Sequence, residues 1–287
     1  MIEFTKMHGL GNDYVYMDCT KSGVPDNVSD LAQFVSNRHF GVGSDGLILI
    51  CSSDTCDFKM KMYNMDGSEA QMCGNGIRCV GKYVYDKGLT NKKRITVETL
   101  AGIKTLDLNV INNKVETVKV DMGEPILEAS KIPVIPDLKD ESKNNNQEVK
   151  NLKIKVLDKE FEFTCVSMGN PHAVAIVDNV KNFEVEKYGS ILEKDAHFPQ
   201  RANIEFIEII DRNTVKMRVW ERGSGETYAC GTGACAVAVA CNINGLVDDE
   251  VTVELLGGNL IIKWDKQNNH VYMTGPATTV FEGKMEY

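Results

Sequence analysis

The sequence has no long apolar run. The longest, residues 234–241, is far too short to cross a bilayer, which takes about 20 apolar residues. The first 18 residues carry Glu3, Lys6, His8 and Asp13 where a signal peptide would need an uninterrupted apolar stretch. We therefore expect no membrane partner, no export and a cytoplasmic location.

Positive charge is scarce. The chain carries a net charge of −9 at pH 7 and has a pI near 5.2. Nucleic acids and anionic membranes need a basic face. The short basic segment Lys92-Lys93-Arg94 is interpreted as a solvated turn, so no nucleic-acid partner is expected.

The sequence also lacks the paired Cys and His spacings of a zinc site. Its nine cysteines are an odd number, which favours free thiols over a disulfide framework. Cys51 with Cys56, and Cys73 with Cys79, are spaced more widely than the ligands of a zinc knuckle. Three cysteines have apolar neighbours and are interpreted as small buried residues: Cys19, Cys165 and Cys241. No metal site is predicted.

An internal repeat is the main positive feature. Cys73-Gly74-Asn75-Gly76 recurs as Cys230-Gly231-Thr232-Gly233, 157 positions later. The same offset relates three further matches: Glu69 with Glu226, Met60 with Met217, and Gly88-Leu89 with Gly245-Leu246. An offset of 158 relates Gly11-Asn12 to Gly169-Asn170. A long-period repeat of this kind indicates two homologous halves in tandem.

Short β-rich runs dominate the rest of the chain. They lie at residues 58–63, 95–98, 115–120, 154–156, 173–177, 204–210, 215–220, 251–255, 260–264 and 271–273. Helical spacing follows each cysteine motif. In the first helix Arg78, Lys82 and Asp86 lie away from the apolar face, and the second helix, apolar on all sides, should be buried. The polar stretch 137–150 is predicted to be a long surface loop. At 287 residues with 43% hydrophobic composition, each half can bury its own core.

The cysteine motif suits proton transfer. Glycines let the backbone approach a ligand closely, and the unpaired N–H groups that begin a helix bind an anion. The same groups lower the pKa of a thiol, which should make the thiolates of Cys73 and Cys230 accessible near neutral pH. Two such helix ends would hold one carboxylate and place a thiol on either face of the neighbouring carbon. One thiolate would remove the α-proton and the other thiol would return a proton from the opposite side.

These motifs resemble the diaminopimelate epimerase family, and the resemblance runs nearly end to end. The segments that carry it are Met7-His8-Gly9-Leu10-Gly11-Asn12-Asp13-Tyr14, Met72-Cys73-Gly74-Asn75-Gly76-Ile77-Arg78-Cys79, Gly169-Asn170-Pro171-His172, Ala229-Cys230-Gly231-Thr232-Gly233-Ala234 and Met273-Thr274-Gly275-Pro276-Ala277.

The resemblance implies a mixed α/β (α+β) fold of two pseudo-symmetric domains. Each would be a curled, mostly antiparallel sheet around a central helix, with the active site in the cleft. We expect the first half to span 1–122, completed by 276–287, and the second to span 123–275. The implied enzyme is a homodimeric, cofactor-independent isomerase that interconverts LL- and meso-2,6-diaminopimelate in lysine and peptidoglycan precursor biosynthesis.

Site residues follow from the same resemblance. Cys73 and Cys230 match the catalytic thiols, with Cys73 as donor and Cys230 as acceptor in one direction. His172 and Glu221 match positions that support catalysis. The substrate-binding positions comprise the carboxylate cradle (Gly74, Asn75, Gly231 and Thr232) and groups that hold the rest of the substrate (Asn12, Asn64, Asn170, Asn203, Glu221 and Arg222). Some family members carry a glutamine near Gly46, where this chain has no side chain to offer.

Alternatives stay open on the residues alone. A related two-cysteine racemase for proline or hydroxyproline would not need Arg222 and Glu221 to hold a distal amino acid end. A phenazine-type isomerase would lack one thiol, and a non-enzymatic thiol module would bind metal or respond to redox state. Taken singly, the asparagines are compatible with turns, His172 with a buried core residue and Arg222 with a solvated charge.

Overall fold

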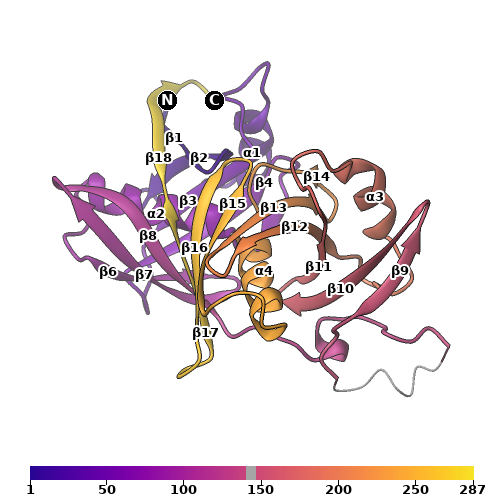
Figure 1. Cartoon of the computed structure of the whole chain (residues 1–287). Helices are drawn as coiled ribbons and strands as arrows, with labels where there is room; N and C mark the ends of the chain where they lie inside the picture. Colours follow the sequence, from indigo (N-terminus) through magenta and orange to yellow (C-terminus); the bar gives the residue numbers. More distant parts are fainter. Residues whose placement is uncertain (140–146) are drawn as a thin grey trace. The chain divides into compact units, whose positions relative to one another are not determined.

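The computed structural model describes residues 1–139 and 147–287 and divides into two compact units. The first comprises Met1–Asp121 and Thr274–Tyr287, and the second comprises Met122–Met273. The first unit is therefore closed by the C-terminal end of the chain. Figure 1 shows the two chain ends close together, where the last strand lies beside the first.

The first unit is a curved sheet around one helix. Its elements are β1 (Ile2–Gly9), β2 (Asn12–Cys19), α1 (Val28–Ser36), β3 (Gly46–Cys51), β4 (Phe58–Asn64), β5 (Glu69–Ala70), α2 (Gly74–Asp86), β6 (Arg94–Thr99), β7 (Gly102–Ile111), β8 (Lys114–Gly123) and β18 (Thr278–Met285). The strands pair in the order β18, β1, β2, β3, β4, β6, β7 and β8. The β2–β3 and β4–β6 pairs are parallel and the others are antiparallel.

The second unit repeats this plan. Its elements are η1 (Ala129–Lys131), β9 (Leu152–Val156), β10 (Lys159–Ser167), β11 (Pro171–Ile176), α3 (Val185–Leu192), β12 (Asn203–Asp211), β13 (Thr214–Glu221), β14 (Gly225–Glu226), α4 (Gly231–Ile243), β15 (Glu250–Leu255), β16 (Gly258–Asp265) and β17 (His270–Pro276), which contains the unit boundary. The pairing order β9, β10, β11, β12, β13, β15 and β16 has parallel partners at β11–β12 and β13–β15.

The prediction of two pseudo-symmetric mixed α/β halves is confirmed. Each unit has the same alternation of parallel and antiparallel pairs, and the repeat register recurs in the pairing. Met60 faces Ile50 across β4 and β3, as Met217 faces Ile207 across β13 and β12. The two units differ in the strand that pairs with their first repeated strand. In the first unit β18, from the C-terminal end of the chain, pairs with β1. In the second unit β9, which directly precedes β10, pairs with β10.

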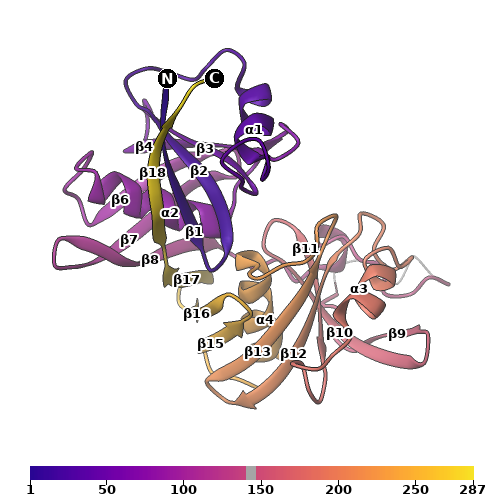
Figure 2. The same ribbon diagram turned by 90° about the horizontal axis from the view of Figure 1, so that it is seen from above.

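A central helix organises each core. Helix α2 contacts β1, β2 and β7, and α4 contacts β10, β11, β12, β15 and β16 (Figure 2). Residues 233–241 of α4 are all buried, as its uniformly apolar sequence predicts. For α2 the prediction was wrong at Arg78, whose side chain is 0% exposed. Its guanidinium donates to the carbonyl oxygens of Gly74 and Pro276 and to Asn75 Oδ1, so hydrogen bonds hold it inside the core.

Nine of the ten predicted β-rich runs lie within strands, and the run at 173–177 extends one residue beyond β11, which ends at Ile176. The predicted loop at 137–150 partly falls on residues 140–146, which lie outside the described part of the chain. In that described part, no helix has the length and apolar character needed to span a membrane.

Candidate functional site

Each motif cysteine is the N-cap residue of its central helix. Cys73 is extended and its Sγ accepts from Gly76 N at 3.3 Å, while Cys230 Sγ accepts from Gly233 N at 3.4 Å. A side-chain acceptor at this position satisfies one of the unpaired N–H groups that begin a helix. The motif therefore fixes each sulfur beside a helix N-terminus.

Close packing explains why the third residue after each motif cysteine is a glycine. A Cβ on Gly76 would lie 2.7 Å from Ile48 Cδ1, and one on Gly233 would lie 2.8 Å from Glu205 Oε1. Neither approach is a normal contact distance. The two glycines thus bring each helix against the equivalent strand, β3 in one unit and β12 in the other.

In the first unit, Asn12 contacts the thiol. Cys73 Sγ donates to Asn12 Oδ1 at 3.1 Å, and Asn75 Nδ2 approaches the same oxygen at 3.4 Å. These three predicted site residues are therefore adjacent. Asn64, at the end of β4, instead donates to Ser68 Oγ at 3.0 Å.

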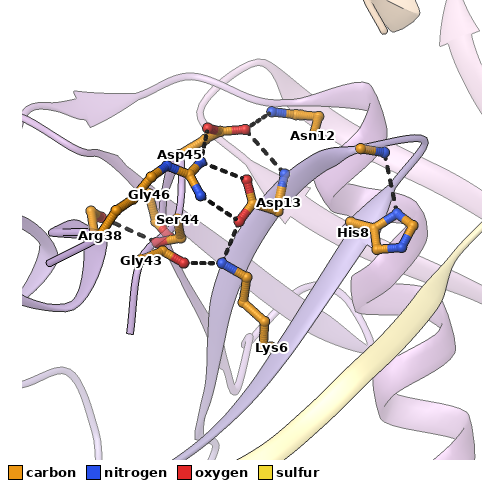
Figure 3. A network of polar contacts seen from close by, with 11 residues as sticks. Lys6, His8, Asn12, Asp13, Arg38, Gly43, Ser44, Asp45 and Gly46 are labelled. Atoms are coloured by element: carbon orange, nitrogen blue, oxygen red, sulfur yellow. Dashed lines mark hydrogen bonds and ion pairs between the residues drawn. The ribbon is translucent and has the colours of Figure 1, made fainter. Parts of the chain in front are cut away.

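A polar network orients Asn12 (Figure 3). Asn12 Nδ2 donates to Asp45 Oδ2 at 2.8 Å, and the other Asp45 oxygen accepts from Arg38 Nη2 at 2.9 Å. Because the amide nitrogen faces Asp45, the amide oxygen faces Cys73. The thiol is thus connected through Asn12 to a carboxylate whose pKa burial raises.

Tyr14 and Gly46 also lie in this part of the first unit. Tyr14 is buried, and both burial and the nearby Cys73 raise the pKa of its phenol well above the ordinary range. At Gly46, which pairs with Tyr14, an added Cβ would lie 2.2 Å from Tyr63 O. The backbone here is too close to Gly46 for any side chain to fit without a shift.

In the second unit, a buried pair occupies the equivalent place. His172 Nδ1 lies 2.6 Å from Glu205 Oε1 and His172 Nε2 lies 3.0 Å from Asn170 Oδ1. His172 and Glu205 are both 0% exposed. The two site residues predicted on β11 and just before it, His172 and Asn170, are therefore in direct contact, and His172 also contacts Glu205, a carboxylate that the sequence analysis did not identify.

Cys230 differs from the sequence expectation. Its residue is 5% exposed, and burial followed by the charges of Glu221 and Glu205 raises the pKa of its thiol well above the ordinary value. The expected lowering of the thiol pKa by the helix N-terminus is therefore wrong for Cys230, because desolvation and two carboxylates outweigh the dipole. Burial also raises the pKa of Glu221, which accepts from Thr227 Oγ1.

Asn203 and Arg222 lie near the end of β13, and Thr232 lies in the first turn of α4. Asn203 is 3% exposed, donates to Pro171 O at 2.8 Å and accepts from Arg222 N at 2.9 Å. The Arg222 side chain is exposed and donates to Gln200 O at 3.2 Å. Thr232 Oγ1 lies 3.6 Å from Cys230 Sγ. Arg222 therefore remains hydrated in the free protein, and leaving it unpaired would not carry the cost of a buried charge.

One group of residues has metal-ligand spacing. Single donor atoms of His172, Glu205 and Cys230 lie within 4.8 Å of one another. The imidazole and the carboxylate already form a 2.6 Å contact, which a cation between them would have to break. We interpret the group as a hydrogen-bonded pair beside a thiol, and the predicted absence of a metal stays a prediction.

Sequence reasoning missed Asp45, Tyr14 and Glu205. A usable signal existed for Glu205, because the 157-residue offset aligns it with Ile48. A carboxylate at a position that is aliphatic in the other half indicates a special environment. Tyr14 aligns with His172 at the 158-residue offset, again with different chemistry in the two halves.

Solved structures with this architecture define a class. A phenazine biosynthesis protein of the PhzF family from Bacillus anthracis aligns with a TM-score of 0.72 at 20% identity, covering 100% of this chain and 99% of that one. A probable proline racemase from Agrobacterium radiobacter K84 aligns with a TM-score of 0.69 at 13% identity, covering 100% and 93%. At these identities the likeness shows the fold alone: the two-half fold of PhzF-type proteins and proline racemases.

Sequence comparison narrows the class to one family. The diaminopimelate epimerase family profile matches residues 4–128 and 164–280. A diaminopimelate epimerase from Acetivibrio thermocellus is 59% identical over 286 residues, covering 99% of each chain. One from Methanococcus maripaludis strain C5 is 57% identical over 285 residues, covering 99% of this chain and all of that one. The chain belongs to the diaminopimelate epimerase family, a family of isomerases.

Proposed function

We propose that this protein interconverts LL- and meso-2,6-diaminopimelate by proton transfer between two thiols, in lysine and peptidoglycan precursor biosynthesis. One thiolate takes the α-proton and becomes a thiol. The carbanion then takes a proton from the opposite thiol, which becomes a thiolate. Cys73 donates and Cys230 accepts in one direction, and the roles exchange in the other.

The observation that carries this proposal is the duplicated N-cap. Both cysteines are the N-cap residue of a buried helix, and each sulfur accepts from the N–H group of the third residue after it. The N-terminus of such a helix favours a carboxylate beside each thiol, and negative charge developing next to that carboxylate during deprotonation. Acid, base and electrostatic stabilisation are then all supplied by the chain, and we propose that no cofactor is needed.

Family membership supports a substrate with two amino acid ends. The Arg222 guanidinium suits bidentate binding of a distal carboxylate, and Glu221 can accept from an ammonium. Asn64 and Asn203 offer both donors and acceptors for the same end. A proline-type racemase has no use for such groups, and turnover of proline at comparable efficiency would favour that alternative.

The decisive experiment follows the α-hydrogen. LL-diaminopimelate is incubated in deuterated water, and stereochemistry and deuterium content are measured together at early times. We expect the meso product to carry solvent deuterium at the inverted carbon while the remaining substrate stays undeuterated, because different groups serve the two faces. Early deuterium in the unreacted substrate would indicate one exchanging base instead, and no inversion at all would contradict the function.

We also propose a cytoplasmic homodimer. The mechanism requires free thiols, which a reducing compartment preserves. The family resemblance supports the dimer, and Val280 and Phe281 on β18 expose 53% and 46% of their surface. Large apolar side chains left exposed are typical of association surfaces. Light scattering coupled to size exclusion, which should give twice the 31.9 kDa chain mass, tests this assignment.

A further inference from the structure

Only one of the two oxygens of the Glu205 carboxylate has a hydrogen-bond partner among the described residues. Its Oε1 contacts His172 Nδ1, but Oε2 is buried and has no hydrogen-bond partner among the described residues. A buried, incompletely satisfied carboxylate is destabilising on its own account. Its retention in the core therefore calls for a role other than packing.

The repeat shows that the fold does not require it. Glu205 and Ile48 occupy equivalent places, each against the glycine three residues after the cysteine of its own unit. An aliphatic side chain thus fills this place in the first unit. The same comparison relates His172 to Tyr14. The second unit therefore has an ionisable carboxylate–imidazole pair where the first has a phenol and an alkyl group.

We infer that Glu205 is a positioning residue, which holds His172 in a single ring orientation beside Cys230 and makes the second thiol chemically different from the first. Its Oε1 lies 2.6 Å from His172 Nδ1, and this contact holds the ring with Nε2 toward Asn170 Oδ1, at 3.0 Å. The activity consequence rests on the proposed epimerase function, whereas the effect on thiol reactivity does not.

The groups that face Cys230 come from four elements. His172 lies on β11, Glu205 on β12 and Glu221 on β13, and Thr232 follows on α4 itself. The negative charge of Glu205 disfavours a thiolate nearby. Removing that charge while keeping the side-chain shape should therefore make the Cys230 thiolate form at lower pH.

The test uses Glu205→Gln and Glu205→Ile in the full chain. Glutamine keeps an acceptor but loses the charge, and isoleucine is the residue that the equivalent position already accommodates. Glu208→Gln is the matched control, because Glu208 lies on the same strand and accepts from Val180 N away from the thiol. Circular dichroism checks that each variant folds.

Alkylation by iodoacetamide is measured from pH 6 to 10 by peptide mass mapping, together with kcat and KM for LL-diaminopimelate. For Glu205→Gln we expect the Cys230 midpoint to move to lower pH and the Cys73 profile to stay unchanged. For both variants we expect kcat to fall by about tenfold to a hundredfold with little change in KM, because a misdirected catalytic group costs that much.

A Cys230 profile in Glu205→Gln that superimposes on the wild-type profile would overturn the inference, whatever happens to kcat. Equal shifts at Cys73 and Cys230 would overturn it as well, since they would indicate a general loosening. If the wild-type protein fails to epimerise diaminopimelate, the proposed function fails, while the alkylation comparison still decides the role of Glu205.

Discussion

The direction of the Asn12 amide is set by the carboxylate of Asp45. Asp45 accepts from Asn12 Nδ2, which leaves Oδ1 for the Cys73 thiol. In Asp45→Asn the charge is lost and the new side chain can donate, so the Asn12 amide can reverse. We expect kcat to fall about tenfold by loss of one oriented hydrogen bond. Steady-state kinetics check this, with the exposed Asp54→Asn as control. Unchanged kcat would show that Asp45 does not orient Asn12.

Removing either sulfur should abolish turnover. In Cys73→Ala or Cys230→Ala one face of the α-carbon loses its proton carrier, and general acid–base groups of this kind contribute at least about a hundredfold. Alanine keeps the Cβ atom of cysteine, so circular dichroism should be unchanged. Epimerisation is followed by chiral chromatography, with the buried Cys241→Ala as the matched loss of a thiol elsewhere in the second unit. Near-normal turnover in either site variant would contradict the two-base mechanism.

The site residues that could be predicted from sequence were mainly those that recur in both halves of the internal repeat. The cysteine motifs and Asn12 with Asn170 recur at a fixed offset, and family resemblance assigns their roles. Arg78 was misplaced because its hydrogen bonds to Gly74, Asn75 and the distant Pro276 satisfy a charged group inside the core. The spacing of residues along a helix gives no information about an acceptor as distant in sequence as Pro276.

At the scale of elements, strands with a clear apolar pattern were predicted and others were not. β3 is buried along its whole length, so Gly46–Cys51 reads as a continuous apolar run rather than an alternation. β1 was missed for the opposite reason, since Thr5 and Lys6 are buried among apolar residues. Lys6 is stabilised there by Asp13 and by the carbonyl of Gly43, contacts that depend on tertiary structure.

That ion cluster links β1 and β2 to the loop before β3 (Figure 3). Burial opposes ionisation of Asp13, but hydrogen bonds from Arg38 and Lys6 outweigh it and lower the pKa of this carboxyl from its ordinary value. A lowered folded-state pKa means that the carboxylate stabilises the fold above the unfolded value and that this contribution is lost as pH falls through the folded value.

We therefore expect Asp13→Asn to destabilise the first unit by about 2 kcal/mol at pH 7, the size of charged hydrogen bonds. The difference from wild type should shrink below about pH 4. Pulsed alkylation of the buried Cys19 and Cys79 in urea reports on this unit, with Asp26→Asn at an exposed position as control. A difference that persists undiminished at low pH would mean that the ionised carboxylate is not the cause.

At the scale of the molecule, the two units obtain one equivalent strand from different parts of the chain. β9 precedes its partner β10 directly, whereas β18 returns from the C-terminal end to pair with β1 from Ile2 to His8. This arrangement explains why the first half cannot be delimited as a continuous stretch. It also makes the stability of the first unit depend on β18, which belongs to neither cysteine motif.

Deleting residues 278–287 should therefore weaken the first unit specifically. The deletion removes the β1 pairing, the edge-to-face contact of Phe281 with Phe4 at 5.9 Å and the ion pair between Glu282 and Lys87. Exposing a strand edge and its apolar neighbours should cost several kcal/mol, at about 25 cal/mol for each Å² of apolar surface uncovered. In pulsed alkylation, Cys19 and Cys79 should become reactive at lower urea concentration than in the full chain. Cys165 and Cys241, which belong to the second unit, supply the reference. Unchanged protection of Cys19 and Cys79 would show that the first unit holds its fold without the strand that closes it.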